Sequence, residues 1–170
     1  MIGVSIDSFD ADTNLRIGRG HLKFKKVLDM RNEAKRMGVM FKVNTVVNQQ
    51  NVREDFNAHM QLLDVDRWKA LQVLKVEREN GNSFDPFAIS DAEFCAFLDR
   101  HGENQALIAE SNAIMRTSYL ILDEQLRFLD GVTKSPFTES ILRDNSAIST
   151  ALDTLDCDAL RARKGNFYLD

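Results

Sequence analysis

The sequence predicts an α/β fold built on a parallel sheet, and three stretches of alternating apolar and polar residues carry that prediction. They are 2–7, 39–47 and 67–76. Side chains of a strand point alternately to its two faces, so each stretch reads as a strand with one apolar and one polar face. Helical patterns separate the three strands. Strands that alternate with helices are typical of a parallel sheet with crossover helices.

Turn residues and helical spacing place the elements of the first half. The loop at 8–20 contains Gly18-Arg19-Gly20, whose glycines allow a tight turn and a close backbone approach to a ligand. An ordinary turn is the alternative. A helix is predicted at 21–37, where Gly38 ends it, and a second helix at 53–63.

The second half is predicted to be mixed. After a polar loop at 77–88, Ser90 and Glu93 form a capping box that starts a helix reaching about Arg100. The other predicted elements are strands at 107–110, 119–123, 127–130 and 141–142, and helices at about 146–155 and 157–163. We therefore expect two regions, 1–78 with the parallel strands and 79–170 as an α+β extension.

Composition narrows the classes of function. The 170 residues are 44% hydrophobic and 28% charged, which is ordinary for a globular domain. The net charge of −4 argues against a general nucleic-acid coat but leaves room for a local basic pocket. No apolar run approaches the roughly 20 residues that span a bilayer, and no signal peptide pattern begins the sequence.

Cysteines and histidines give no sign of a metal site. Cys95 and Cys157 are far apart and lack metal-ligand spacing, and the three histidines are isolated. We expect Cys95 to be a small buried hydrophobe and the histidines to lie at the surface or at helix caps.

Polar residues of the predicted strands form a candidate anion site. Lys42, Asn44, Arg67 and Lys69 take the polar faces of their strands, and ligands of parallel α/β barrels bind at the C-terminal strand ends. Buried cations need an anionic partner, because an unpaired charge in the interior is expensive. A polyphosphate would supply one, and so would a carboxylate such as Asp7 or Glu77. An edge strand with a solvated basic face is the alternative.

Several sequence blocks together resemble the viperin-like family of radical S-adenosylmethionine (SAM) enzymes, the radical SAM nucleotide dehydratases. They are IDSFD at 6–10, IGRG at 17–20, FKVN at 41–44, RWK at 67–69, ESN at 110–112, SYLILDE at 118–124 and RFL at 127–129. The blocks stand in the family's order and at nearly its spacing over about residues 3–143. The resemblance implies the C-terminal part of a partial (β/α)6 radical SAM barrel with a C-terminal α+β extension.

The resemblance also implies an activity in antiviral defence. Viperins dehydrate CTP to 3′-deoxy-3′,4′-didehydro-CTP, a terminator of viral RNA polymerases. A [4Fe–4S] cluster cleaves SAM to a radical that takes hydrogen from C4′, and the 3′-hydroxyl leaves as water. Relatives also use UTP or GTP, so the preferred nucleotide stays open.

Site residues follow from the matching positions. Ser5, Arg19, Asn44 and Val46 resemble the SAM-binding residues, with the Arg19 guanidinium on the methionine carboxylate. The positions that resemble the triphosphate clamp are Lys42, Arg67, Lys69 and Lys134. Tyr119 resembles the tyrosine near the bound nucleotide; by pattern alone, it could stack on a base or belong to the core.

One departure from the family is decisive for the expected chemistry. The cluster motif Cys-x-x-x-Cys-x-x-Cys is absent, so we expect this chain alone neither to hold the cluster nor to cleave SAM. Animal family members anchor to the endoplasmic reticulum and lipid droplets through an N-terminal amphipathic helix that this sequence lacks; otherwise the cytoplasm is expected. Two other functions stay open, a non-enzymatic adaptor with the same fold and an α/β module that binds a nucleotide or phosphosugar without a P-loop.

Overall fold

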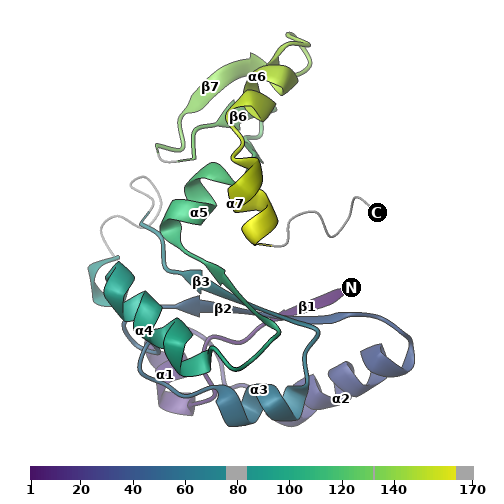
Figure 1. The fold of residues 1–170 in the computed structure, drawn as a ribbon, viewed down its shortest axis with the longest axis vertical. Helices are drawn as coiled ribbons and strands as arrows, with labels where there is room; N and C mark the ends of the chain where they lie inside the picture. The colour runs from purple at the N-terminus through teal and green to yellow at the C-terminus, as the bar shows by residue number, and fades with distance from the viewer. Residues whose placement is uncertain (76–83, 132, 164–170) are drawn as a thin grey trace. The chain divides into compact units, whose positions relative to one another are not determined.

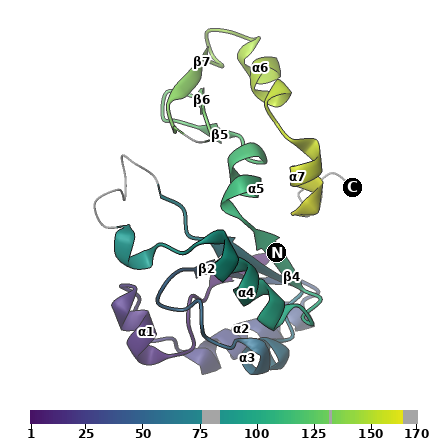
Figure 2. The ribbon, with the colours of Figure 1, turned by 60° about the vertical axis from the view of Figure 1, so that its left-hand side comes forward.

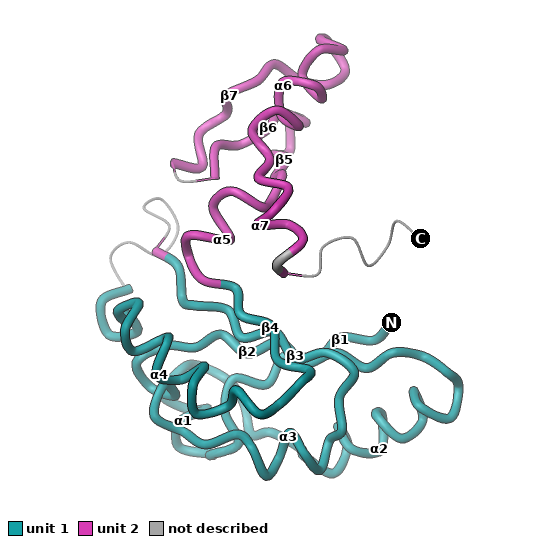
Figure 3. Tube along the Cα trace, in the orientation of Figure 1, with its two compact units in different colours: residues 1–74, 84–110 teal, residues 75–83, 111–170 magenta. Residues whose placement is uncertain are grey.

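The computed structural model describes residues 1–75, 84–131 and 133–163. These residues form two compact units, shown in two colours in Figure 3. The first unit contains residues 1–74 and 84–110, and the second contains the described residues from Ser111 onward together with Lys75. Residues 84–110, which the sequence assigned to the C-terminal extension, thus pack with the first unit.

The first unit is organised around a four-stranded parallel sheet (Figure 1). Its strands are β1 (Ile2–Ser5), β2 (Phe41–Val47), β3 (Arg67–Gln72) and β4 (Leu107–Glu110). They lie side by side in chain order, β1-β2-β3-β4, and every neighbouring pair is parallel. The prediction of a parallel sheet is therefore confirmed, although β1, β2 and β3 are each shorter than expected.

Four α-helices of this unit cover one face of the sheet, as Figures 1 and 2 show. They are α1 (Ala11–Arg16), α2 (Phe24–Arg36), α3 (Asn57–Leu63) and α4 (Asp91–His101), and a short 3-10 helix, η1, spans Asp85–Phe87. A right-handed crossover between parallel strands places its helix on a fixed side of the sheet. Because the strands follow one another in chain order, successive crossovers return to the same face.

The core lies between this sheet face and the helices. Along β2, Phe41, Val43, Thr45 and Val47 are buried and the residues between them are half-buried. On β3, Trp68 is fully buried and stacks on Phe56 of the loop before α3. Burying each such apolar side chain contributes about 1.5–3 kcal/mol. The apolar face is therefore committed to packing, which leaves the opposite face for polar residues.

The capping box of α4 is confirmed, and two expectations about its neighbourhood are wrong. The Ser90 hydroxyl accepts from the Glu93 N–H, and the Glu93 carboxylate accepts from the Ser90 N–H. Cys95 is exposed rather than buried. His101 is fully buried rather than at the surface.

The burial of His101 sets its protonation state. Its Nε2 accepts from the Phe56 N–H at 3.0 Å, and its Nδ1 lies 2.7 Å from the Phe97 carbonyl oxygen, to which it donates. Loss of hydration on burial lowers the pKa of His101 below its usual value. The imidazole is therefore neutral, with its proton on Nδ1, and it ties α4 to the start of α3.

The second unit pairs a small antiparallel sheet with three short helices. Its elements are α5 (Asn112–Thr117), β5 (Ile121–Leu122), β6 (Arg127–Leu129), β7 (Pro136–Ser140), α6 (Ala147–Asp153) and α7 (Cys157–Ala162). The sheet order is β5-β6-β7. The pairing predicted around 119–130 is present in shortened form. The last strand was misplaced: it spans 136–140, and Leu142 is 80% exposed in the turn that follows.

A close backbone approach holds the turn after β6 against α5. A Cβ atom added to Gly131 would lie only 1.9 Å from the Arg116 carbonyl oxygen. This position therefore accepts only glycine without a shift of the backbone. Within the part of the chain that is described, no helix is long and apolar enough to cross a membrane.

Candidate functional site

The polar face of the parallel sheet brings the predicted cations together. The strand register sets Lys42 beside Arg67, and it sets Asn44 between Ser5 and Lys69. Arg67 and Lys69 are 5% and 9% exposed, and Trp68 between them points into the core. From the spacing of sheets, Lys42 and Lys69 have Cα atoms about 8 Å apart on this face. The prediction that Lys42, Arg67 and Lys69 share one face of the sheet is thus confirmed.

The side chain of Lys42 lies against Gly3 of β1. A Cβ atom at Gly3 would lie 3.7 Å from Cε of Lys42, so the aliphatic stem of Lys42 passes over β1. The stem is packed while the ammonium group lies beyond it, as is usual for lysine.

Lys69 has an internal carboxylate partner that sequence reasoning missed. Its ammonium group forms an ion pair with Glu110, the fully buried last residue of β4. Of the two carboxylates considered from sequence, Asp7 pairs with Arg19 and Glu77 lies outside the described residues. The strand predicted at 107–110 places Glu110 on the same face as Ile108, two residues earlier, but the neighbour of Glu110 across the sheet depends on the strand order.

Asp7 builds the edge of the sheet at the C-terminal ends of β1 and β2. One carboxylate oxygen accepts from the Val46 N–H at 2.8 Å, and the other accepts from Nε and Nη2 of Arg19 at 2.8 and 2.7 Å. The Asp7 carbonyl accepts from the Asn51 side chain at 2.6 Å. Asp7 is 6% exposed, whereas the Arg19 side chain is 52% exposed. The guanidinium is therefore held on one side and open to solvent on the other.

The glycines beside Arg19 explain how the chain reaches this place. Asp10 caps α1 by accepting from the Thr13 N–H, and the helix ends at Arg16. Gly18 then adopts a positive φ of 76°, which turns the chain back toward β1. The turn predicted at this triplet is present, but α1 before it was not predicted.

Two hollows flank the ion pair of Asp7 and Arg19. The first, of about 350 Å³, is lined by Ser5, Asp7, Arg19 and residues of the following loop. The second, of about 370 Å³, is lined by Asp7, Gly18, Arg19, Val46 and residues near them. Both volumes fall within the usual range of small-molecule sites. Of the four residues predicted to bind SAM, Arg19 therefore borders both hollows, Ser5 borders the first and Val46 borders the second.

Asn44, the fourth of these residues, offers an unused acceptor. Its Oδ1 atom is buried and has no hydrogen-bond partner among the described residues. Buried polar atoms are usually hydrogen-bonded, so a ligand with amine or hydroxyl donors suits this position. The hydroxyl of Ser5, the guanidinium of Arg19 and this amide oxygen match the carboxylate, ammonium and hydroxyl groups that SAM carries. The residues present fit that cofactor.

An iron–sulfur cluster does not fit the described residues. Cys95 and Cys157 are both exposed and belong to different units. Among the described residues, no three His, Cys, Asp or Glu side chains are grouped so that they could hold a metal ion. A [4Fe–4S] cluster requires thiolate ligands, and the whole sequence contains two cysteines.

Tyr119 and Lys134, the remaining predicted site residues, lie in the second unit. The Arg163 guanidinium stacks over the Tyr119 ring, 3.6 Å from its centroid. Lys134 has a positive φ of 55°, and its ammonium group donates to the Gly131 carbonyl oxygen at 3.0 Å. Tyr119 borders a separate hollow of about 330 Å³ with Arg116, Asp130 and Phe137.

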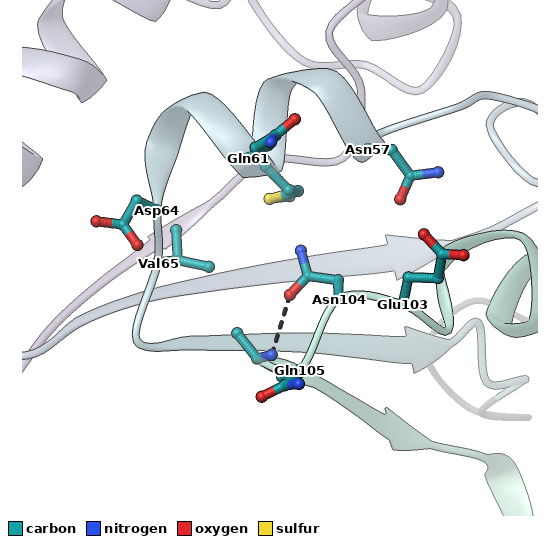
Figure 4. Close-up of a pocket in the computed structure, with 9 residues that line it drawn as sticks. Asn57, Gln61, Asp64, Val65, Glu103, Asn104 and Gln105 are labelled. Carbon is teal, nitrogen blue, oxygen red and sulfur yellow. Dashed lines mark hydrogen bonds between the residues drawn. The ribbon is translucent and has the colours of Figure 1, made fainter.

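The hollow in Figure 4 contains none of the predicted site residues. It measures about 540 Å³ and lies between α3 and the loop that leads into β4. Its lining includes Gln61, Asp64 and Glu103, and Asn104 is engaged with the backbone of Ala106 at 3.0 Å. It borders the N-terminal ends of the strands, whereas ligands of parallel sheets bind at the C-terminal ends.

Together these features define an α/β protein with three cations on one sheet face and two hollows around the ion pair of Asp7 and Arg19. The chain is 45% identical over 139 residues to the S-adenosylmethionine-dependent nucleotide dehydratase RSAD2 of Danio rerio, and 44% identical over 139 residues to that of Oncorhynchus mykiss. Each match covers 76% of this chain, and 38% or 40% of the relative.

A third relative extends the match. The S-adenosylmethionine-dependent nucleotide dehydratase of Lacinutrix mariniflava is 35% identical over 164 residues, which cover 92% of this chain and 34% of the relative. No family model matches the chain. The chain belongs to the family of S-adenosylmethionine-dependent nucleotide dehydratases, that is, the viperin family. It spans between a third and two fifths of the length of these relatives.

Proposed function

We propose that this chain provides the SAM-binding and triphosphate-binding residues of a radical SAM dehydratase that converts CTP to 3′-deoxy-3′,4′-didehydro-CTP in antiviral defence. One observation carries the proposal: Lys42, Arg67 and Lys69 share one sheet face, in a chain whose relatives are named nucleotide dehydratases. The net reaction removes hydrogen from C4′ and the hydroxyl from C3′, so CTP loses one water and gains a 3′,4′ double bond.

The proposed architecture is part of a (β/α)6 barrel. Strands in chain order with helices on one face are the arrangement of such barrels, in which the other face lines the interior. The four strands of the first unit would contribute their polar face to that interior. On this face Ser5 and Val46 lie near the C-terminal ends of their strands, whereas Lys42 and Arg67 lie near the N-terminal ends of β2 and β3.

The three cations are suited to hold the triphosphate. Hydrogen bonds between a cation and phosphate oxygens are short and strong, and a planar guanidinium binds two oxygens at once. Lys42 and Arg67 lie side by side on adjacent strands, so they can engage one phosphate group together. We assign Lys134 and Tyr119 to the same substrate on the strength of the family resemblance alone.

The residues around Arg19 are suited to hold SAM, which supplies radical chemistry when it is bound. Arg19 keeps N–H groups available beyond those that Asp7 engages, and these would hold the methionine carboxylate. The Ser5 hydroxyl would donate to or accept from the remaining polar groups, and the Oδ1 atom of Asn44 would accept from them. Fixing the cofactor relative to the ribose is what these residues contribute to catalysis.

We further propose that this chain alone does not carry out the reaction, because its two cysteines cannot supply the three thiolates of the cluster motif. After anaerobic reconstitution with iron and sulfide, incubation with SAM and a reductant should yield no 5′-deoxyadenosine by mass spectrometry. Formation of 5′-deoxyadenosine at several turnovers per chain would refute this point.

The triphosphate site is tested by isothermal titration of the chain with CTP. Lys42→Gln should weaken binding by about 10- to 100-fold, which corresponds to one charged hydrogen bond. Lys26→Gln, on the exposed face of α2, carries the same charge change and should bind like the wild type. Equal weakening by both variants would reject the assignment. Lys69 is less suitable, because its removal would leave Glu110 buried without its ion-pair partner.

A further inference from the structure

Glu110 is a buried carboxylate that contacts Lys69, one of the three cations of the proposed anion site. It ends β4 with 0% exposure and pairs in register with Leu71. Since Leu71 and Lys69 are two residues apart on β3, they share a face, and Glu110 lies on the same face as the cations. Its ion pair with Lys69 crosses from β4 to β3. The Glu110 carboxylate therefore lies on the same sheet face as the cations and directly contacts Lys69.

Stability alone does not account for this pair. Removing two charges from water costs several kcal/mol per ion, and apolar side chains in the place of a buried ion pair are often as stable or more stable. In contrast, a fixed carboxylate on an anion-binding face has a direct effect on ligands. The Glu110 carboxylate forms an ion pair with Lys69 in the absence of a ligand, and its negative charge repels an anion that binds nearby.

We propose that Glu110 is a specificity-determining residue that sets the minimum charge an anion needs to bind this face. A singly or doubly charged phosphate would gain little from Lys69, since it must compete with a buried carboxylate that is already in place. A triphosphate reaches Lys42 and Arg67 as well, and its larger charge compensates for the repulsion. The inference rests on the proposed triphosphate site and deepens it: Glu110 selects polyphosphates over monophosphates.

The test compares two inorganic probes, orthophosphate and tripolyphosphate, by isothermal titration of the chain without added metal. The wild type should bind tripolyphosphate at least 100-fold more tightly than orthophosphate. Glu110→Gln keeps the shape of the side chain and removes its charge. This variant should bind orthophosphate at least tenfold more tightly than the wild type, and the ratio between the two probes should fall.

A matched control separates a local effect from a change in net charge. Glu103→Gln changes the net charge by the same amount at an exposed position near the opposite end of β4, and it should bind both probes like the wild type. If Glu110→Gln binds orthophosphate no more tightly than Glu103→Gln does, the role of Glu110 is refuted while the triphosphate site stands. If neither the wild type nor Glu110→Gln binds tripolyphosphate, both the inference and the proposed site are refuted.

A second measurement covers the case in which Glu110→Gln does not fold. The fluorescence of Trp68, buried in the same unit, reports whether the variant is folded. If the variant is unfolded, the wild-type preference for tripolyphosphate over orthophosphate decides the question. A preference above 100-fold supports the proposed minimum charge for binding. A ratio below 100-fold contradicts it, because a carboxylate that competes for Lys69 must disfavour the smaller anion.

Discussion

Thr45 links β2 to β3 and to the residue that follows β1, and replacing it with valine should destabilise the first unit by about 2–4 kcal/mol. The Thr45 hydroxyl accepts from the Trp68 indole N–H at 3.0 Å and donates to the Ile6 carbonyl oxygen at 2.7 Å. All three residues are at most 1% exposed. Thr45→Val keeps the shape but removes both bonds. An unsatisfied buried indole donor costs about 1–3 kcal/mol, and the lost bond to the carbonyl costs about 1 kcal/mol more.

Urea unfolding followed by tryptophan fluorescence measures this effect in the right unit, because Trp68 is the only tryptophan of the chain. With a typical slope of about 2 kcal/mol per molar urea, the midpoint should fall by about 1–2 M. Thr45→Ser is the control: it keeps the hydroxyl and loses one methyl group, at a cost of about 1 kcal/mol. If Thr45→Val unfolds at the same urea concentration as Thr45→Ser, the hydrogen-bonded link across the strands does not contribute as argued.

Three other changes have expected outcomes. Burial lowers the pKa of His101 in the folded state. In the unfolded state His101 has the ordinary histidine pKa of about 6.5, so near and below that pH the unfolded state binds more protons than the folded state. The free energy of unfolding should therefore fall as the pH drops from 7.5 to 5.5. The urea midpoint of the wild type should follow this trend, and that of His101→Phe should be flatter over the same range. Gly131→Ala should lower the thermal midpoint measured by circular dichroism, since its Cβ would lie 1.9 Å from the Arg116 carbonyl oxygen. Gly102→Ala is the control and should have little effect, because the atom nearest to its Cβ would lie 3.5 Å away. Similar losses in the two variants would contradict this reasoning. Ser90→Ala should cost about 1 kcal/mol by urea unfolding through loss of the α4 cap, and an unchanged midpoint would show that the cap is dispensable.

Local sequence patterns predicted the structure correctly where a feature depends on a single strand or a single helix end. The alternation of 41–47 predicts that Phe41 and Val43 face the core while Lys42 and Asn44 face the other way, and the structure confirms it. The capping box at Ser90 is likewise visible from four residues. Such features depend on contacts between residues that are near in sequence, so the sequence alone predicts them.

Features that depend on distant partners were missed. The helices α1 and α5 have six residues each, too few to be stable without their caps, Asp10 and Ser111, and the surrounding packing. Glu110 could be identified as the ion-pair partner of Lys69 only once β4 was known to lie beside β3. Cys95 is different, because a signal existed: the buried residues Phe94 and Phe97 define the inner face of α4, and position 95 turns away from it.

The alternation along β2 and β3 also has an evolutionary consequence. Neighbouring residues of one strand serve separate demands, since Val43 and Trp68 are packed in the core while Lys42 and Lys69 lie on the opposite face. A substitution at position 42 or 44 can therefore change the polar face without opening a cavity in the interior. Relatives that share this sheet can differ on its polar face while they keep the same core. Selection would act on the two sets of positions almost independently.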